Sequence, residues 1–375
     1  MAEIISGQSP PSESYRNTPG GLPFFQGKAD FGELHPLARV WCVAPERIAE
    51  PGDILLSVRA PVGPTNVADV RCCIGRGLAA IRPSVGVDRD FILLALRWFE
   101  SSLAQLGSGS TFAAVTRKQL KTIQVPTPSS SEQQRLSAQA IRELAQVERA
   151  RAAVAVQLAA VAKLAPAHLR ALFSDVKMWP SRVLGEVGAL LPAKSISTNA
   201  DAEVLAVTTA CLTETGFDER GTKTARMRSA DVPQCTLRPG EILIARSNTP
   251  DLVGRVAVFP GMEQPAVASD VTIRLWCNDL AVPQFVSAYL SYLYLSGYWK
   301  ERAGGASGTM KKITRPQILG LKVPLPAPDE QRMISDSLER KMGATLNCRS
   351  ELQSQVESIE RLPDALLRAA LSGEL

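Results

Sequence analysis

Two short segments, residues 109–133 and 307–331, carry hydroxyl and basic side chains around glycine-containing turns. Backbone amides, hydroxyls, lysines and arginines are the usual partners of phosphate groups, and such contacts fix position without reading a base sequence. These residue types therefore favour phosphate binding at both places. The candidates are Thr111, Arg117 and Lys118 in the first segment and Thr309, Lys311, Lys312 and Arg315 in the second.

A second pair of candidate sites follows two similar strands, PGDILL at residues 51–56 and PGEILI at residues 239–244. The residues after them are Ser57 and Arg59 in the first case and Arg246, Ser247 and Asn248 in the second. Arginine can bind guanine through two hydrogen bonds, and asparagine can do the same with adenine. An ordinary solvated loop is the competing interpretation for any one residue, but recurrence at matched places favours DNA contact. A further basic run at residues 223–228 has no counterpart and is interpreted as a solvated face.

Motifs of several enzyme classes are absent from the sequence. The Gly-Lys pair at residues 27–28 lacks the earlier glycine and the following Ser or Thr of a P-loop. Neither a glycine loop for S-adenosylmethionine nor the [DNS]PP[YF] motif of nucleic-acid methyltransferases is present in convincing form. The two histidines, His35 and His168, lie far apart, and the seven cysteines include no CxxC spacing. We therefore expect no catalytic residue, no cofactor and no metal in this chain.

An internal repeat explains why the candidate sites come in pairs. Residues 109–133 align without a gap on residues 307–331, with about nine identities in 25 positions, and the same offset of about 198 continues to LRALFS over LRAALS. Upstream, the PG(D/E)IL strands correspond with an offset near 188. The chain is therefore predicted to be a tandem duplication, in which each copy is a variable globular unit followed by a helix of fixed length.

A long helix is predicted after each PxP sequence, because Ser or Asp can cap it and Glu begins its first turn. Apolar residues recur at a 3-4 spacing through residues 137–165 and again through residues 335–363, and both seams carry one arginine, Arg151 and Arg349. We predict an antiparallel coiled coil between the two helices, a rod on the order of 60 Å with a globular unit at each end. The alternative is a pair of core helices within one large domain.

The globular units are predicted to mix short strands with one helical stretch each, at residues 90–106 and 283–302. The predicted strands are DILLSV at residues 53–58, EILIA at 241–245, RVAVF at 255–259 and VTIRL at 271–275. The fold class is therefore α+β, with two α/β domains and two long helices. The most apolar helical stretch, Phe285–Trp299, is too short to span a bilayer, and the amino terminus lacks a signal peptide. A soluble cytoplasmic protein is expected.

The chain resembles the specificity subunits of type I restriction-modification systems. The resemblance rests on STFAAVTRKQLKTIQVPTPSSSEQ and SGTMKKITRPQILGLKVPLPAPDEQ, on the PG(D/E)IL strands, on LPFFQGKADFG at residues 22–32 and on the final SGEL. It implies target-recognition domain 1 over residues 1–128, a conserved helical region over 129–176, target-recognition domain 2 over 177–326 and a second helical region over 327–375.

The resemblance also implies a function. Each recognition domain would read one half of a bipartite double-stranded DNA target, the helices would set the half-site spacing and dock two methyltransferase subunits, and restriction or translocase subunits would join. The alanine-rich residues 150–162 suit such docking, because they present apolar surface. Two alternatives remain: a coiled-coil adaptor that spaces two protein-binding modules, and a non-catalytic part of a different defence system.

Overall fold

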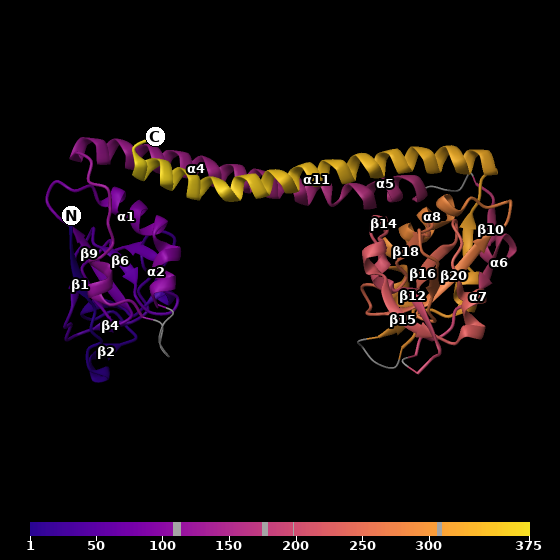
Figure 1. The fold of residues 1–375 in the computed structure, drawn as a ribbon, viewed down its shortest axis with the longest axis horizontal. Helices are drawn as coiled ribbons and strands as arrows, with labels where there is room; N and C mark the ends of the chain where they lie inside the picture. The colour runs from indigo at the N-terminus through magenta and orange to yellow at the C-terminus, as the bar shows by residue number, and fades with distance from the viewer. Residues whose placement is uncertain (108–113, 175–178, 198, 306–309) are drawn as a thin grey trace. The chain divides into compact units, whose positions relative to one another are not determined.

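The computed structural model describes residues 1–107, 114–174, 179–197, 199–305 and 310–375. The chain separates into two compact units. The first unit comprises residues 1–155 and 354–375, and the second unit comprises residues 156–353. Each unit mixes helices and sheets, which confirms the expected mixed α and β content (Figure 1).

The first unit is built on a four-stranded antiparallel sheet in the order β1-β9-β6-β7. A second sheet has the order β2-β4-β3-β8-β5, in which β3 and β8 are parallel. The strands are β1 (Ala2–Ser6), β2 (Tyr15–Arg16), β3 (Leu22–Phe25), β4 (Trp41–Cys42), β5 (Ile48–Ala49), β6 (Ile54–Ser57), β7 (Thr65–Val67), β8 (Cys72–Ile74) and β9 (Leu78–Pro83). The shorter helices are α1 (Arg89–Trp98), α2 (Glu100–Gly107) and α3 (Arg117–Leu120).

The second unit repeats this plan with the four-stranded order β11-β20-β16-β18 and a parallel pair, β12 and β19. Its strands are β10 (Ser181–Val183), β11 (Gly188–Leu191), β12 (Ala202–Val207), β13 (Leu212–Thr213), β14 (Gly216–Phe217), β15 (Lys223–Met227), β16 (Ile242–Ala245), β17 (Ser247–Asn248), β18 (Val256–Val258), β19 (Ala266–Ala268), β20 (Thr272–Cys277), β21 (Lys311–Lys312) and β22 (Lys322–Pro324). Its shorter helices are α5 (Leu164–Phe173), α6 (Leu184–Val187), α7 (Val232–Cys235), α8 (Pro283–Leu295), α9 (Tyr298–Arg302) and α10 (Arg315–Leu319).

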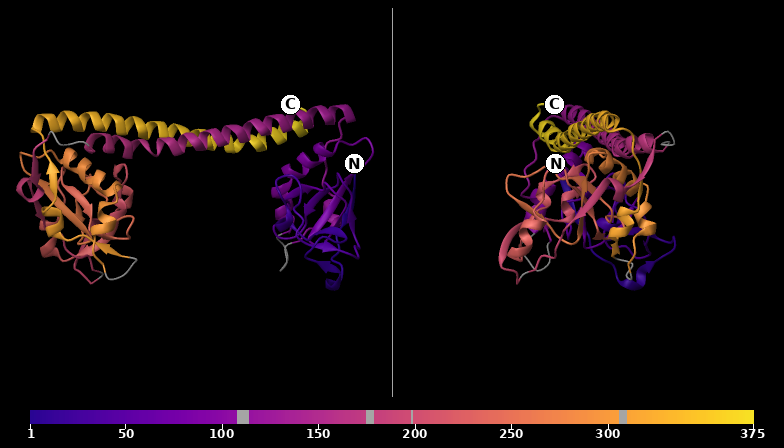
Figure 2. Two further views of the ribbon diagram at one scale, coloured as in Figure 1. Left: turned by 180° about the vertical axis from the view of Figure 1, so that it is seen from behind. Right: turned by 90° about the vertical axis from the view of Figure 1, so that its right-hand side faces the viewer.

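The central strands β6 and β16 are apolar on both faces because each face is covered. In β16, Ile242 and Ile244 pack with Phe285 of α8, whereas Leu243 packs on the opposite side with Val207 of β12. In β6, Ile54 and Leu56 face α1 in the same way, and Leu55 faces the other side. An unbroken apolar run is typical of such a doubly covered strand. Figures 1 and 2 show α8 on the side of its sheet that lies toward α5.

The predicted helical stretches of the globular units are each interrupted. The first stretch divides into α1 and α2, with the junction at Phe99. The second divides into α8 and α9 at Gly297, whose φ of +81° places it in the left-handed region. Glycine takes this conformation without the penalty that a Cβ atom imposes. A change of direction therefore replaces the single continuous helix expected at residues 283–302.

The long helices are α4 (Ser130–Val161) and α11 (Pro328–Ser372). The prediction of a continuous first helix was wrong, because a turn at Ala162 and Lys163 separates α4 from α5. Pro166 accounts for the turn: it has no N–H to donate to the carbonyl of Ala162, and its ring crowds that carbonyl. The equivalent region of α11 remains helical, although it contains Pro363.

The long helices contribute to the core of both units, with segments of α4 and α11 in the first unit and a segment of α11 in the second. In the first unit, Ala140 and Leu144 of α4 pack with Leu367 and Ala370 of α11 beside α1. In the second unit, Leu338 and Met342 of α11 pack on the cluster that holds Leu169 and Phe173 of α5. Among the predicted seam positions, Ala140, Val147, Val154 and Val161 are buried and Arg151 is exposed. Pairing of the two helices over their whole length stays a prediction.

One helical stretch, Ser130–Phe173, is long and apolar enough to cross a membrane by length and composition alone. Its most apolar 18-residue window has a mean hydropathy of 1.5, and 17% of that window is buried. A single such helix is weak evidence for a membrane span, because core helices of soluble proteins pass the same test. Residues 285–299, singled out by the sequence as the most apolar helical stretch, lie on the shorter helices α8 and α9.

The cysteines lead to a prediction about thiol reactivity. Cys348 is exposed on α11, whereas the other six cysteines are buried and unpaired. Burial raises the pKa of Cys72 and of Cys277 to about 12, so these thiols remain protonated near pH 8 and react slowly. We expect about one thiol per native chain to react quickly with a disulfide reagent, and Cys348→Ser to remove that phase. A fast phase that persists in Cys348→Ser would contradict the burial of the others.

Candidate nucleic-acid interface

In the second unit, the chain that leaves β16 pairs with the chain that leads into α10. Strands β17 and β21 form an antiparallel pair in which Ser247 lies opposite Lys312 and Asn248 opposite Lys311. Arg246 is held at the base of the pair, because its carbonyl accepts a hydrogen bond of 2.8 Å from the amide of Ile313. Five predicted residues, distant in sequence, thus lie together in a two-stranded ribbon.

The first unit contains a smaller version of this arrangement. The chain after β6 forms a single antiparallel bridge between Arg59 and Ala114, and the amide of Val115 donates to the carbonyl of Val58 at 2.9 Å. Arg59, Arg117 and Lys118 are all exposed. The predicted residues Thr111 and Thr309 lie outside the described part of the chain.

A capping box fixes the helix beside each cluster. The Thr116 and Thr314 amides donate to the side-chain oxygens of Gln119 and Gln317 at 2.9 and 2.8 Å, and each threonine hydroxyl accepts from the glutamine amide at 3.3 Å. The Gln317 side chain also donates to the carbonyl of Arg302 at 2.8 Å. These contacts satisfy the free amides of the first helical turn. They place Arg117 and Arg315 at the first position of α3 and α10.

The predicted residues differ in exposure and in whether their polar atoms already form hydrogen bonds within the chain. Ser57 is 2% exposed, and its hydroxyl donates to the carbonyls of Arg59 and Pro61 at 3.1 and 2.8 Å, so it shapes the turn. Arg315 donates to the carbonyl of Leu191 at 2.9 Å. Lys312 is exposed, and Lys311 is half-buried.

Arg246 and Asn248 retain unused donors at the ribbon. Arg246 donates through Nη1 to the carbonyl of Asp270 at 3.2 Å, but its Nε is buried without a hydrogen-bond partner among the described residues. Asn248 accepts the amide of Thr249 on Oδ1 at 2.9 Å. That bond orients the side-chain amide and leaves its Nδ2 donor in a half-buried position. Hydrogen-bonding groups held in this way suit an interface that reads base edges.

Sequence reasoning missed one neighbouring feature of the ribbon. Gly304 forms an antiparallel bridge with Lys312, which brings the end of α9 beside the cluster. There the Arg302 guanidinium lies 4.1 Å from the centre of the Tyr298 ring. The sequence YWKER carries a signal for it, because two aromatic residues are followed there by Lys300 and Arg302. Within the described residues, no group of three or more His, Cys, Asp or Glu side chains is placed to hold a metal ion.

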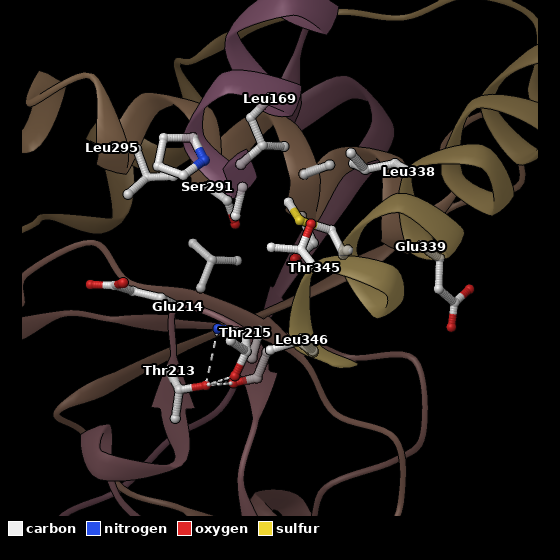
Figure 3. Close-up of a pocket in the computed structure, with 18 of the residues that line it drawn as sticks. Leu169, Thr213, Glu214, Thr215, Ser291, Leu295, Leu338, Glu339, Thr345 and Leu346 are labelled. Carbon is white, nitrogen blue, oxygen red and sulfur yellow. Dashed lines mark hydrogen bonds between the residues drawn. The ribbon is translucent and has the colours of Figure 1, made fainter. Parts of the chain in front are cut away.

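The second unit also contains a cavity of about 320 Å³ on another side, where α5, α8 and α11 meet the β13–β14 hairpin (Figure 3). Leu169, Leu295, Leu338 and Leu346 line it together with threonine and serine hydroxyls. At its edge Arg255 contacts Glu214 at 3.3 Å. The lining is largely apolar, which distinguishes this cavity from the basic ribbon.

Known proteins similar to this chain point to one family. The model of one protein family, described as "Type I restriction modification DNA specificity domain", matches residues 1–144 of this chain. A putative type I restriction enzyme MjaX specificity subunit from Methanocaldococcus jannaschii is 41% identical over 150 residues, which cover 39% of this chain and 35% of the relative. The MjaIX specificity subunit from the same organism is 26% identical over 148 residues, 36% of this chain and 34% of the relative. The chain thus spans about a third of the length of these relatives.

Two solved structures are also similar to parts or the whole of this chain. The HsdS subunit from Thermoanaerobacter tengcongensis is 49% identical, with coverage of 40% of this chain and 37% of that one and a TM-score of 0.37. The type I S subunit from M. genitalium is 16% identical, with coverage of 99% and 93% and a TM-score of 0.41.

Proposed function

Because this chain belongs to the specificity subunits of type I restriction-modification systems, we propose that it recognises a bipartite double-stranded DNA target. Each unit would read one half-site. The observation that carries this proposal is the recurrence of one arrangement in both units: an exposed basic cluster where the chain after the central strand meets the chain before a capped helix. Basic side chains supply affinity for the phosphates, and oriented amide and guanidinium groups supply base reading.

The residues proposed to bind DNA are the candidates that the sequence predicted. We propose direct DNA contact for Arg59, Arg117 and Lys118 of the first unit and for Arg246, Asn248, Lys311 and Lys312 of the second, all of them exposed or half-buried. Ser57, Ser247 and Arg315 support the loops, through the contacts described above or through strand pairing. Recognition domains over residues 1–128 and 177–326, with helical regions over 129–176 and 327–375, are part of the same proposal.

DNA selection tests the recognition role. The chain, assembled with methyltransferase subunits, is used to select duplexes from a random library, and the bound duplexes are sequenced. We expect two fixed blocks separated by an unselected spacer of constant length. Enrichment of a single continuous block, or no enrichment above background, would contradict the proposal.

The long helices are proposed to act in spacing and in assembly. Alanine-rich residues 150–162 include Val156, which is 71% exposed, and the cavity beside α11 is largely apolar. Apolar surface of this kind marks protein interaction sites. We assign it to two methyltransferase subunits, with restriction or translocase subunits joining that complex. The chain itself supplies recognition and no catalytic group.

Spacing by the helices leads to a quantitative prediction. Insertion of one heptad into both α4 and α11 adds about 10.5 Å of helix. At about 3.4 Å per base pair, this corresponds to roughly three base pairs. We expect the selected spacer to lengthen by about that amount while both half-sites stay the same. The readout is the DNA selection above; an altered half-site with an unchanged spacer would exclude the helices as the spacing element.

A further inference from the structure

The glutamine of each repeated EQ pair occupies the same buried joint between a long helix and its globular domain. Gln133 of α4 is 4% exposed and Gln331 of α11 is 0% exposed. Both residues lie within the first turn of their helix, three positions after its start. Burial of an uncharged side-chain amide near the start of a helix calls for hydrogen-bond partners.

The two glutamines make equivalent contacts in the two units. Gln133 accepts the amide of Asp88 at 3.0 Å and donates to the carbonyl of Pro128 at 2.8 Å. Gln331 accepts the amide of Val282 at 2.8 Å and donates to the carbonyl of Pro326 at 2.8 Å. Asp88 and Val282 are the N-cap residues of α1 and α8, and both prolines close the PxP sequence. One side chain therefore connects the long helix, the connecting segment and the domain helix.

The second joint has additional contacts. Gln331 also donates to the carbonyl of Leu280 at 2.9 Å, so its amide makes three hydrogen bonds. Next to it, the Trp179 indole donates to Glu330 at 3.1 Å. Apolar packing supports both joints: Phe91 contacts the Leu136 cluster in the first unit, and Ile334 packs on the Phe285 cluster in the second. The hydrogen bonds are directional, so they restrict rotation that apolar contacts alone would permit.

We propose that Gln133 and Gln331 are positioning residues that hold each globular domain at one angle to its long helix. This explains why a fixed PxP sequence precedes the EQ pair by the same interval in both copies: the proline carbonyl is the acceptor five residues before the glutamine. We infer a further role for the joint in DNA spacing, and this inference rests on the proposed function. A rigid connection between two binding modules favours one spacing of their sites, whereas a loose one accepts several.

The joint is tested by measuring a distance within the second unit. Spin labels are attached to the exposed native Cys348 of α11 and to Thr224→Cys, an exposed position on β15. Wild type should give one narrow distance distribution. Gln331→Leu preserves the side-chain volume but removes the hydrogen bonds, and we expect a distribution about twofold broader because the domain turns on its helix. Gln353→Leu, on the exposed surface of α11, is the control and should leave the width unchanged.

Two further measurements separate the joint from general destabilisation. Gln331→Asn retains the amide but shortens its reach, and it replaces Gln331→Leu if that variant does not fold; it too should broaden the distribution. A folded variant with the wild-type width would overturn the proposal. In the DNA selection, the preference of Gln331→Leu for one spacer length over lengths one base pair different should fall by about threefold or more. Unchanged spacer preference in a broadened variant would overturn the spacing role.

The proposed DNA recognition and the proposed positioning role of the glutamines can be contradicted independently. If the wild-type chain selects no DNA, the recognition function is wrong, and the label distances still decide whether Gln331 fixes the domain. The first unit provides a second comparison, in which Gln133→Leu is paired with Gln134→Leu at the adjacent exposed position. We expect only Gln133→Leu to relax the spacer preference.

Discussion

Arg274→Met is expected to lower the free energy of unfolding of the second unit by about 3–5 kcal/mol, because it leaves a buried carboxylate without its partner. The Arg274 and Glu241 side chains are 2% and 0% exposed and meet at 2.7 Å. Arg274 donates in addition to the carbonyls of Pro192, Gln234 and Thr236. For a unit of this size the loss corresponds to a fall in Tm on the order of 10 °C.

Matched variants identify the cause of that loss. Removal of both charges in Glu241→Leu with Arg274→Met should recover part of the stability, because the unpaired charge disappears. Arg220 and Asp218 form an equally short pair at 2.7 Å, but the Arg220 side chain is 88% exposed, so Arg220→Met should leave unfolding unchanged. Thermal and urea unfolding measure all three variants. A loss in Arg220→Met equal to that in Arg274→Met would contradict the role of burial.

Asn248→Ala is expected to weaken target binding by about 1–3 kcal/mol and to relax base preference in one half-site only. The reason is positional: Asn248 is held opposite Lys311 in the ribbon of the second unit, and the first unit has its own cluster around Arg59. Lys312→Ala should instead weaken binding to all sequences, since it removes one phosphate contact. The slope of log Kd against log salt concentration should therefore become shallower by about 0.9.

The control for Lys312 is Lys223→Ala, an exposed lysine of the same unit on β15, for which no DNA contact is proposed. Fluorescence anisotropy with the selected duplex at several salt concentrations gives both affinity and slope. Repetition of the selection with Asn248→Ala shows which half-site has relaxed. Relaxation in both half-sites, or an equal loss in Lys223→Ala, would remove Asn248 and Lys312 from the interface.

Much of each unit was predictable because local patterns determine it. The strands EILIA and DILLSV appear as β16 and β6, since uninterrupted apolar runs between turn residues suit strands covered on both faces. The capping boxes at Thr116 and Thr314 follow from the T-x-x-Q spacing alone. Pro166 also indicated the turn at Ala162, but the heptad spacing of apolar residues favoured one continuous helix.

The joint and the ribbon were beyond sequence reasoning for a different reason. Gln331 contacts Leu280 and Val282, and Ser247 pairs with Lys312; these partners are about 50 and 65 residues away. Such contacts depend on how strands and helices pack, which a motif does not specify. The same holds for Ser57, a polar loop residue by sequence that the structure buries against the carbonyl of Pro61.

We propose that this chain alone determines which DNA sequence its complex marks. The most direct measurement is genome-wide mapping of methylated adenine in a host that has no adenine methylation of its own. The host produces type I methyltransferase subunits with or without this chain. We expect one asymmetric bipartite motif, methylated only when the chain is present. Methylation of the same sites without the chain, or no bipartite motif with it, would show that another component selects the DNA.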